Sequence, residues 1–377
     1  VYPSASFGKL TSALNSVSTS ITLAPEGIGA DYEASGLVRI NREIMAFTRS
    51  GDVMTLVRGQ EGTSGQNHEA GDVVQECGVL DGLPINQAVE AILKYKDSSF
   101  DAFIPTAEWQ EENDTWFSGT TIGRVILPKP MGKSQLIGEL CQLGVMVWWS
   151  ATEQKIRFKV NSPLLPGEEY YPVNDRDSLI EGTVDISRAE DQRISALWIY
   201  HGVRDWTDDS LTVQNFSKLS IAPVSENLYG QEAYKEIFTR WFGRFGDEGS
   251  ASIIAERLLA RYRNVPRVIS GSLDVKDRVG VDLASRLSVE TYALNSVDGS
   301  TTAELMQVNY AEYTGDGRVE FKAETYNVSG RFAFWLDDGT APVDYDSATD
   351  AQRSAGMFWG DANNPGMPDG SSDYLWF

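Results

Sequence analysis

The residues best suited to catalysis are scarce in this sequence. It holds two histidines, His68 and His201, and two cysteines, Cys77 and Cys141. Neither histidine has a neighbour at metal-ligand spacing, and the cysteines form no CxxC pair. We therefore expect neither a zinc site nor a disulfide framework, and interpret both cysteines as small buried hydrophobic residues. No catalytic, metal-binding or cofactor-binding residue is predicted.

Paired carboxylates are the remaining source of acid–base chemistry. Glu111, Glu112 and Asp114 lie beside Trp109 and Trp116, and glycosidases use such a combination to cleave a sugar and stack it. Because the chain holds 54 acidic residues, neighbours of this kind are expected by chance. The cluster is better interpreted as an exposed, solvated turn.

Two further patterns could hold an ion. The loop from Gly59 to Gly65 is glycine-rich, but a phosphate loop needs a helix after it. Here a β segment follows and the loop contains no Lys, so we interpret it as a structural hairpin loop. Asp344, Asp346 and Asp350 are spaced loosely like calcium ligands. They lack the glycine and the final Glu of an EF-hand loop.

The net charge of −22 over 377 residues excludes several classes of partner. Phosphate backbones and anionic lipids repel so acidic a chain, so we expect neither sequence-specific nucleic-acid binding nor stable membrane insertion. No apolar run approaches the roughly 20 residues of a membrane span. The first residues do not form a signal peptide. Because Val1 stands where an initiator Met is usual, we expect that further residues precede it.

The spacing of apolar residues predicts an α+β, β-rich chain of several domains. We expect a small β module over 1–82, an α+β unit of a helix and a hairpin over 83–177, and a β-rich domain with one helix over 178–330. Residues 331–377 hold few aliphatic residues and are predicted to be extended. Helices are expected after Pro84, over 134–143 and over 250–263, and hairpins over 145–160 and around Thr314–Gly317.

Aromatic residues are the most informative surplus, with ten Trp spread over every segment. In the C-terminal segment the pair Phe334-Trp335 recurs as Phe358-Trp359, which predicts two similar aromatic-anchored turns. Core packing is the favoured role of the other Trp residues, whereas core packing and burial between subunits explain the C-terminal ones equally well. The candidate inter-subunit anchors are Phe334, Trp335, Phe358, Trp359 and Trp376.

Two stretches resemble the central hub, or tail-tip, proteins of long-tailed bacteriophages, the siphophages and Mu-like phages. One is Arg58–Thr63 followed by His68–Val74, a pattern common in small β modules of phage tail-tip and fibre proteins. The other stretch is C-terminal and comprises Phe332–Trp335, Asp344-Tyr345, Ala351–Arg353, Gly366–Gly370 and Tyr374. Between these two stretches, Leu283–Tyr326 resembles the β-domain that such hubs contribute to a trimeric ring.

This resemblance implies a structural role without catalysis. Such proteins form a homotrimer that closes the tail tube at the distal end of the virion and opens for DNA passage. Their partners are the distal tail protein, the tape-measure protein, and a tail spike or fibres. Some relatives hold an iron–sulfur cluster on four cysteines, and with two cysteines this chain is predicted to hold none. An acidic wall would keep passing DNA from adhering.

Two alternative functions stay open at this stage. A receptor- or carbohydrate-binding tail module would use exposed Trp to stack on sugar rings. A cell-wall hydrolase would use a pair of carboxylates.

Overall fold

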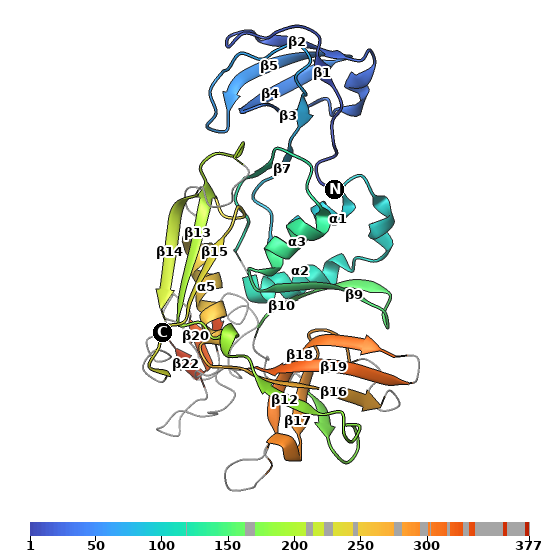
Figure 1. Cartoon of the computed structure of the whole chain (residues 1–377), viewed down its shortest axis with the longest axis vertical. Helices are drawn as coiled ribbons and strands as arrows, with labels where there is room; N and C mark the ends of the chain where they lie inside the picture. Colours follow the sequence, from blue (N-terminus) through green and yellow to red (C-terminus); the bar gives the residue numbers. More distant parts are fainter. Residues whose placement is uncertain are drawn as a thin grey trace.

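The computed structural model describes residues 1–117, 119–162, 170–208, 214–221, 229–243, 248–274, 281–294, 301, 303–314, 317–326, 332–335, 357–359 and 374–376. They form the predicted α+β, β-rich chain of several sheets and a few helices. Figure 1 shows an elongated molecule with the N-terminal sheet at one end, a helical unit below it with a three-stranded sheet at its side, and a larger sheet at the other end. None of the described helices is long and apolar enough to cross a membrane.

The N-terminal sheet has six strands in the order β1-β2-β5-β4-β3-β6. Exposed and buried residues alternate along β5, so one face of the strand packs on the core. Met54 and Leu56 are buried on that face, while Val53 and Val57 are exposed. Most buried hydrophobic side chains of this sheet form a cluster of their own, whereas Leu37 and Ile44 belong to the larger cluster that includes the helical unit. The strands are β1 (Lys9–Leu10), β2 (Ser20–Ala24), β3 (Ser35–Ile40), β4 (Glu43–Ser50), β5 (Val53–Gln60) and β6 (Gln75–Glu76).

The helical unit combines three α-helices with a hairpin. The helix expected after Pro84, the helix over 134–143 and the hairpin over 145–160 are confirmed. The structure adds a helix over Thr106–Phe117, which includes the carboxylate–tryptophan cluster that the sequence predicted as an exposed turn. The elements are β7 (Gly78–Leu80) paired with β8 (Val125–Leu127), α1 (Ile85–Lys94), α2 (Thr106–Phe117), α3 (Lys133–Cys141), β9 (Val145–Ser150) and β10 (Lys155–Val160).

A three-stranded sheet shares the core of this helical unit. Its order is β14-β13-β15, with β13 at the centre. The elements are β13 (Ala196–Val203), β14 (Gln214–Ile221), β15 (Tyr234–Phe238) and the confirmed helix α5 (Glu248–Tyr262). One hydrophobic cluster joins Leu140 and Phe158 of the helical unit to Leu197, Trp241 and Ile254. Side chains that come before and after residue 177, where the sequence predicts a domain boundary, therefore pack into one core.

The last large sheet has the order β11-β17-β18-β19-β16-β12 and a separate hydrophobic cluster. The hairpin predicted around Thr314–Gly317 is confirmed as β18–β19. The strands of this large sheet are β11 (Tyr171–Asn174), β12 (Asp185–Arg188), β16 (Arg267–Asp274), β17 (Arg286–Glu290), β18 (Glu304–Tyr313) and β19 (Arg318–Thr325). A further small sheet comprises β20 (Phe332–Trp335), β21 (Met357–Trp359) and β22 (Tyr374–Trp376).

Candidate functional site

The five candidate anchor residues lie in one small sheet. Strand β20 pairs antiparallel with β21, which places Phe334 opposite Phe358. The same β20 pairs parallel with β22, which places Phe334 opposite Trp376, and Figure 1 shows β20 and β22 next to each other. The prediction of two aromatic-anchored turns is therefore wrong, because the repeated Phe-Trp pairs are strands, as the β preference of aromatic residues favours. Their role between subunits stays a prediction.

A buried carboxylate organises the N-terminal motif. Glu43 begins β4 and is 0% exposed. Arg58 Nε donates to its Oε1 at 2.8 Å and Arg58 Nη2 to its Oε2 at 2.7 Å, a two-point pairing. The backbone N–H groups of Gly59 and Gln66 donate to the same carboxylate at 3.0 and 2.8 Å. His68 Nε2 lies 2.9 Å from its Oε2.

Arg58 extends this network to the surrounding backbone. Its Nη1 donates to the carbonyl oxygens of Asn15 and Ser18 at 2.6 and 2.9 Å, and its Nη2 donates to the carbonyl of Gln66 at 2.6 Å. Three backbone carbonyls, from two loop segments, are thus tied to one ion pair. Arg58 and His68 of the Arg58–Thr63 and His68–Val74 motif thus form a structural clamp around Glu43.

The hydrogen bonds around Glu43 set its ionisation. Burial alone would raise the pKa of this carboxyl group. The donors of Arg58, Gln66, His68 and Gly59 outweigh that cost and lower the pKa to about 2. Glu43 is therefore ionised near neutral pH. The sequence motif includes Arg58 and His68 but not Glu43, so the group at its centre escaped prediction.

Glycines let the clamp close. Gly59 has φ +61°, a backbone conformation that residues other than glycine rarely adopt. A Cβ on Gly65 would lie 2.6 Å from the carbonyl oxygen of Ser16, so only glycine fits beside that chain. The loop has a structural role, but the prediction of a hairpin loop is wrong, because the strands that it joins, β5 and β6, do not pair with each other.

The carboxylate–tryptophan cluster is a helix and not the predicted exposed turn. It forms α2, in which Trp109 and Trp116 are 1% and 5% exposed. Trp109 Nε1 also donates to the carbonyl of Ile156 at 3.1 Å. The turn prediction fails because the tryptophans pack into the core contributed by distant strands. Neither indole offers a face on which a sugar could stack.

The carboxylates of α2 hold the helix against β10. Glu112 Oε2 pairs with Lys159 Nζ at 2.6 Å, and Glu112 Oε1 accepts the N–H of Val160 at 2.9 Å. Glu108 pairs with Arg157 of the same strand. These contacts cover the backbone edge of β10 that β9 leaves free. The two carboxylates thus have structural partners.

The cysteines and His201 come from different elements, since Cys141 ends α3, His201 lies in β13, and Cys77 lies between β6 and β7. Both thiols are free. Burial raises the pKa of the Cys77 thiol to about 12 and also raises that of Cys141, which is half-buried. His201 is buried, with Nδ1 at 3.2 Å from the Gly243 carbonyl oxygen. In the part of the chain that the structure describes, no group of three or more His, Cys, Asp or Glu could hold a metal ion. The predicted weak calcium pattern, Asp344, Asp346 and Asp350, lies outside the described residues.

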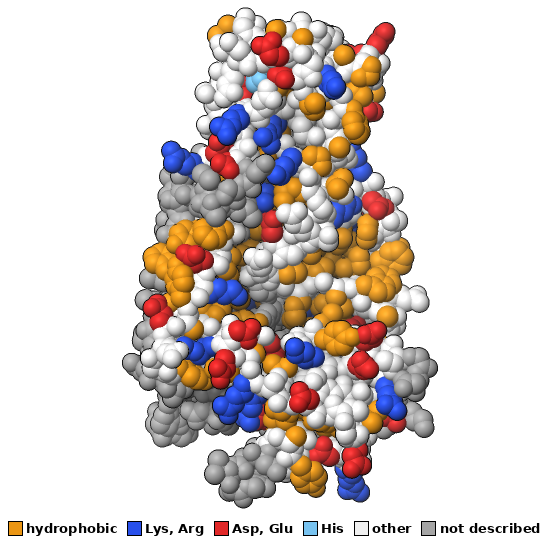
Figure 2. All heavy atoms as spheres, in the orientation of Figure 1, with side chains coloured by type: hydrophobic (Ala, Val, Ile, Leu, Met, Phe, Trp, Pro, Cys, Tyr) orange, Lys and Arg blue, Asp and Glu red, His pale blue; other side chains and the backbone are white. Residues whose placement is uncertain are grey.

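An aromatic ladder covers one face of the β13–β15 sheet. The rings of Trp198 and Tyr200 are stacked with centroids 6.0 Å apart, and those of Tyr200 and Phe238 with centroids 4.6 Å apart. The hydroxyls of Tyr200 and Tyr234 both donate to Glu236 Oε1, at 3.2 and 2.5 Å. Figure 2 shows hydrophobic side chains gathered over this part of the molecule. Because the rings stack on each other, this surface suits contact with a protein better than stacking of a sugar.

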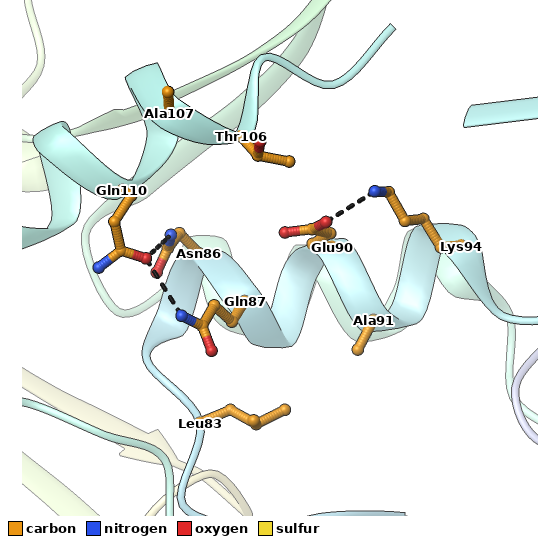
Figure 3. Close-up of a pocket in the computed structure, with 9 residues that line it drawn as sticks. All are labelled: Leu83, Asn86, Gln87, Glu90, Ala91, Lys94, Thr106, Ala107 and Gln110. Atoms are coloured by element: carbon orange, nitrogen blue, oxygen red, sulfur yellow. Dashed lines mark hydrogen bonds and ion pairs between the residues drawn. The ribbon is translucent and has the colours of Figure 1, made fainter. Parts of the chain in front are cut away.

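A groove of about 580 Å³ separates α1 from α2. At one end Gln110 Oε1 accepts from Asn86 Nδ2 and from Gln87 Nε2, each at 3.1 Å (Figure 3). Towards the other end Glu90 pairs with Lys94 at 2.7 Å. No sequence signal singled out this groove, because its walls come from two helices of which one was not predicted. Its lining residues are Leu83, Asn86, Gln87, Glu90, Ala91, Lys94, Thr106, Ala107 and Gln110.

The likenesses to known proteins come from solved structures, among them two phage tail proteins. No family model and no curated protein matches the sequence. The 43 kDa tail protein of prophage MuSo2 from Shewanella oneidensis is similar over 85% of this chain and 95% of its own, with 9% identity and a TM-score of 0.37. The prophage tail protein gp18 from Listeria monocytogenes EGD-e is similar over 86% of this chain and 89% of its own, with 11% identity and a TM-score of 0.34. Scores this low do not show a shared fold.

Proposed function

We propose that this chain is a structural protein of a bacteriophage tail, and specifically the hub at its distal end. Three copies form a ring that closes the tail tube and opens for DNA passage. The ring contacts the distal tail protein and the tape-measure protein, and it carries a spike or fibres. The residues that support this proposal are the two stretches that resemble tail-tip hubs.

The observation that carries the proposal is the sheet formed by β20, β21 and β22. Its strands come from three parts of the segment 332–376 and bring Phe334, Phe358 and Trp376 into one backbone register. Aromatic residues concentrate the binding energy of protein interfaces, since each buries a large rigid area. A small aromatic sheet at the C-terminal end of a chain is suited to docking on a neighbouring subunit. The five anchors are proposed to act there.

The clamp in the N-terminal module agrees with a structural role. The family-like motif has its Arg58 and His68 side chains directed at Glu43 and so at holding the module together. A module of this kind presents a rigid surface to a neighbour and needs no reactive group. The net charge of −22 suits the same function, because like charge keeps passing DNA from adhering to the tube wall.

The proposal is tested by the mass of the purified chain in solution. Light scattering is expected to give three times the mass of 41.6 kDa for one chain. A variant with Trp335, Trp359 and Trp376 all replaced by Ala is expected to shift towards monomer. Phe7→Ala serves as the control, because Phe7 is 70% exposed and lies in the N-terminal module. An unchanged mass of the triple variant would show that these Trp residues do not hold the subunits together.

A receptor-binding module is the second candidate, and one observation favours it. Trp149 is 51% exposed, more than any other Trp whose exposure the structure describes, and meets Phe103 edge-on at 5.4 Å between ring centroids. The pair lies at the end of the β9–β10 hairpin. Trp149→Ala is expected to leave adsorption of phage to host cells unchanged if the hub account holds. A large loss of adsorption would favour the receptor-binding function.

A further inference from the structure

We propose that the groove between α1 and α2 is a docking site for a cationic peptide segment of a partner protein. This site is separate from the aromatic sheet β20–β22. Its size lies within the range of pockets that hold small ligands or short segments. Figure 3 shows side chains from both helices facing the space.

The walls of the groove allow the close approach of another backbone. Ala91 lies on α1, Ala107 on α2, and Leu83 just before α1. Ala107 is exposed and Ala91 is half-buried. Side chains this small leave room for a peptide main chain, and Leu83 adds apolar surface. In the absence of an aromatic lining residue, a sugar ring has nothing on which to stack.

The polar end of the groove is one hydrogen-bond donor short. Asn86 is 2% exposed, and its Oδ1 has no hydrogen-bond partner although its Nδ2 is bonded. Gln110 Oε1 already accepts two donors, and Gln110 Nε2 donates to Asp114 Oδ1 at 2.7 Å. A backbone N–H of the partner that reaches Asn86 Oδ1 would supply the missing donor. Peptides carry such a group at nearly every residue.

The charges around the groove favour a cationic segment. Lys94 pairs with Glu90 at 2.7 Å and with Asp101 at 2.8 Å, so two carboxylates face one ammonium group. Asp114 adds a third carboxylate through Gln110. A Lys or Arg side chain from the partner would meet this excess of negative charge. A second copy of this chain is a poorer occupant, since its own net charge is −22.

The test uses the full chain and a displayed library of random linear peptides. Peptides that enrich on the wild-type chain are synthesised and titrated by fluorescence anisotropy. We expect them to be rich in Lys or Arg, and we expect Glu90→Gln to weaken their binding at low salt. Ala107→Trp fills the groove from an exposed position, and it is expected to weaken binding by at least about tenfold. Ala102→Trp is the matched control, because Ala102 is exposed and does not line the groove.

Several outcomes would overturn this proposal. Failure of any peptide to enrich, enrichment of acidic peptides, or equal binding to the Ala107→Trp variant would each do so. A fall in the mass of the assembly on Ala107→Trp, measured by light scattering, would make a second copy of this chain the occupant. Circular dichroism of both Trp variants checks that a loss of binding does not come from unfolding.

Discussion

The guanidinium of Arg58 and the buried carboxylate of Glu43 form a two-point ion pair, with N–O distances of 2.8 and 2.7 Å. This pair gives the arginine of the motif a structural partner, and His68 contacts the same carboxylate. The arginine, the glycines and the histidine are each needed at their positions because they enclose one carboxylate. The module is held at its centre by polar contacts, beside a separate hydrophobic cluster.

Replacing Glu43 by Gln is expected to destabilise the N-terminal module by about 3–5 kcal/mol, since it leaves the Arg58 charge buried without its partner. Hydrogen exchange of the β4 and β5 amides in the full chain measures the change. Glu26→Gln is the control, because Glu26 is exposed in the same module. Equal protection in the two variants would show that the clamp contributes nothing.

The stability of this module is expected to depend on acid. The pKa of Glu43 is lowered from 4.5 to about 2 in the folded chain, so the unfolded state binds more protons between these values. Glu43 therefore stabilises the module fully above about pH 4.5. That contribution is lost as the pH falls towards 2. Hydrogen exchange of β4, corrected for the intrinsic effect of pH, should show this loss in the wild type, and Glu43→Gln should remove this component of it.

The ion pair of Arg261 and Glu324 joins α5 to β19 and is expected to stabilise the joint. The two side chains are buried, with Nη2 and Oε1 at 2.7 Å. Glu324→Gln should cost about 3–5 kcal/mol of unfolding free energy, because it strands a buried guanidinium. Chemical denaturation followed by Trp fluorescence measures it. Glu320→Gln, an exposed position on the same strand, should change little, and a similar loss in both variants would contradict the role of the pair.

Trp109→Ala is expected to destabilise the helical unit by about 3–5 kcal/mol, because it opens a large cavity in the core. It also removes the hydrogen bond to the carbonyl of Ile156. Thermal unfolding measures the change, with the exposed Trp149→Ala as the control. If Trp109 instead served ligand binding at the surface, its replacement would leave stability unchanged.

Elements with a local signal could be predicted from the sequence. The β9–β10 hairpin alternates apolar and charged residues along Lys155–Val160, and α5 repeats apolar residues with helical spacing. Helix α2 could not, because its carboxylates are neutralised by β10 and its tryptophans are buried by elements distant in sequence. The periodicity of α2 alone does not reveal those partners.

The candidate site, too, could be predicted from the sequence only in part. The Phe-Trp repeat in the C-terminal segment marks the anchors, but the register of Phe334 with Phe358 and Trp376 depends on segments far apart in the chain. Glu43 is hidden for the same reason, since its donors come from four positions that lie 15 to 25 residues further along the chain. The sequence signal that could have identified Glu43 is an acidic residue at the start of a largely apolar strand, followed further along the chain by an Arg-Gly pair.

The position and symmetry of this chain in a native phage particle test the central claim most directly. Electron cryo-microscopy of the particle should place three copies around the tail axis at the distal end of the tube, with β20–β22 of each copy at a contact between subunits. A chain that occurs as a monomer, or that lies in the head or along the tail shaft, would contradict the account.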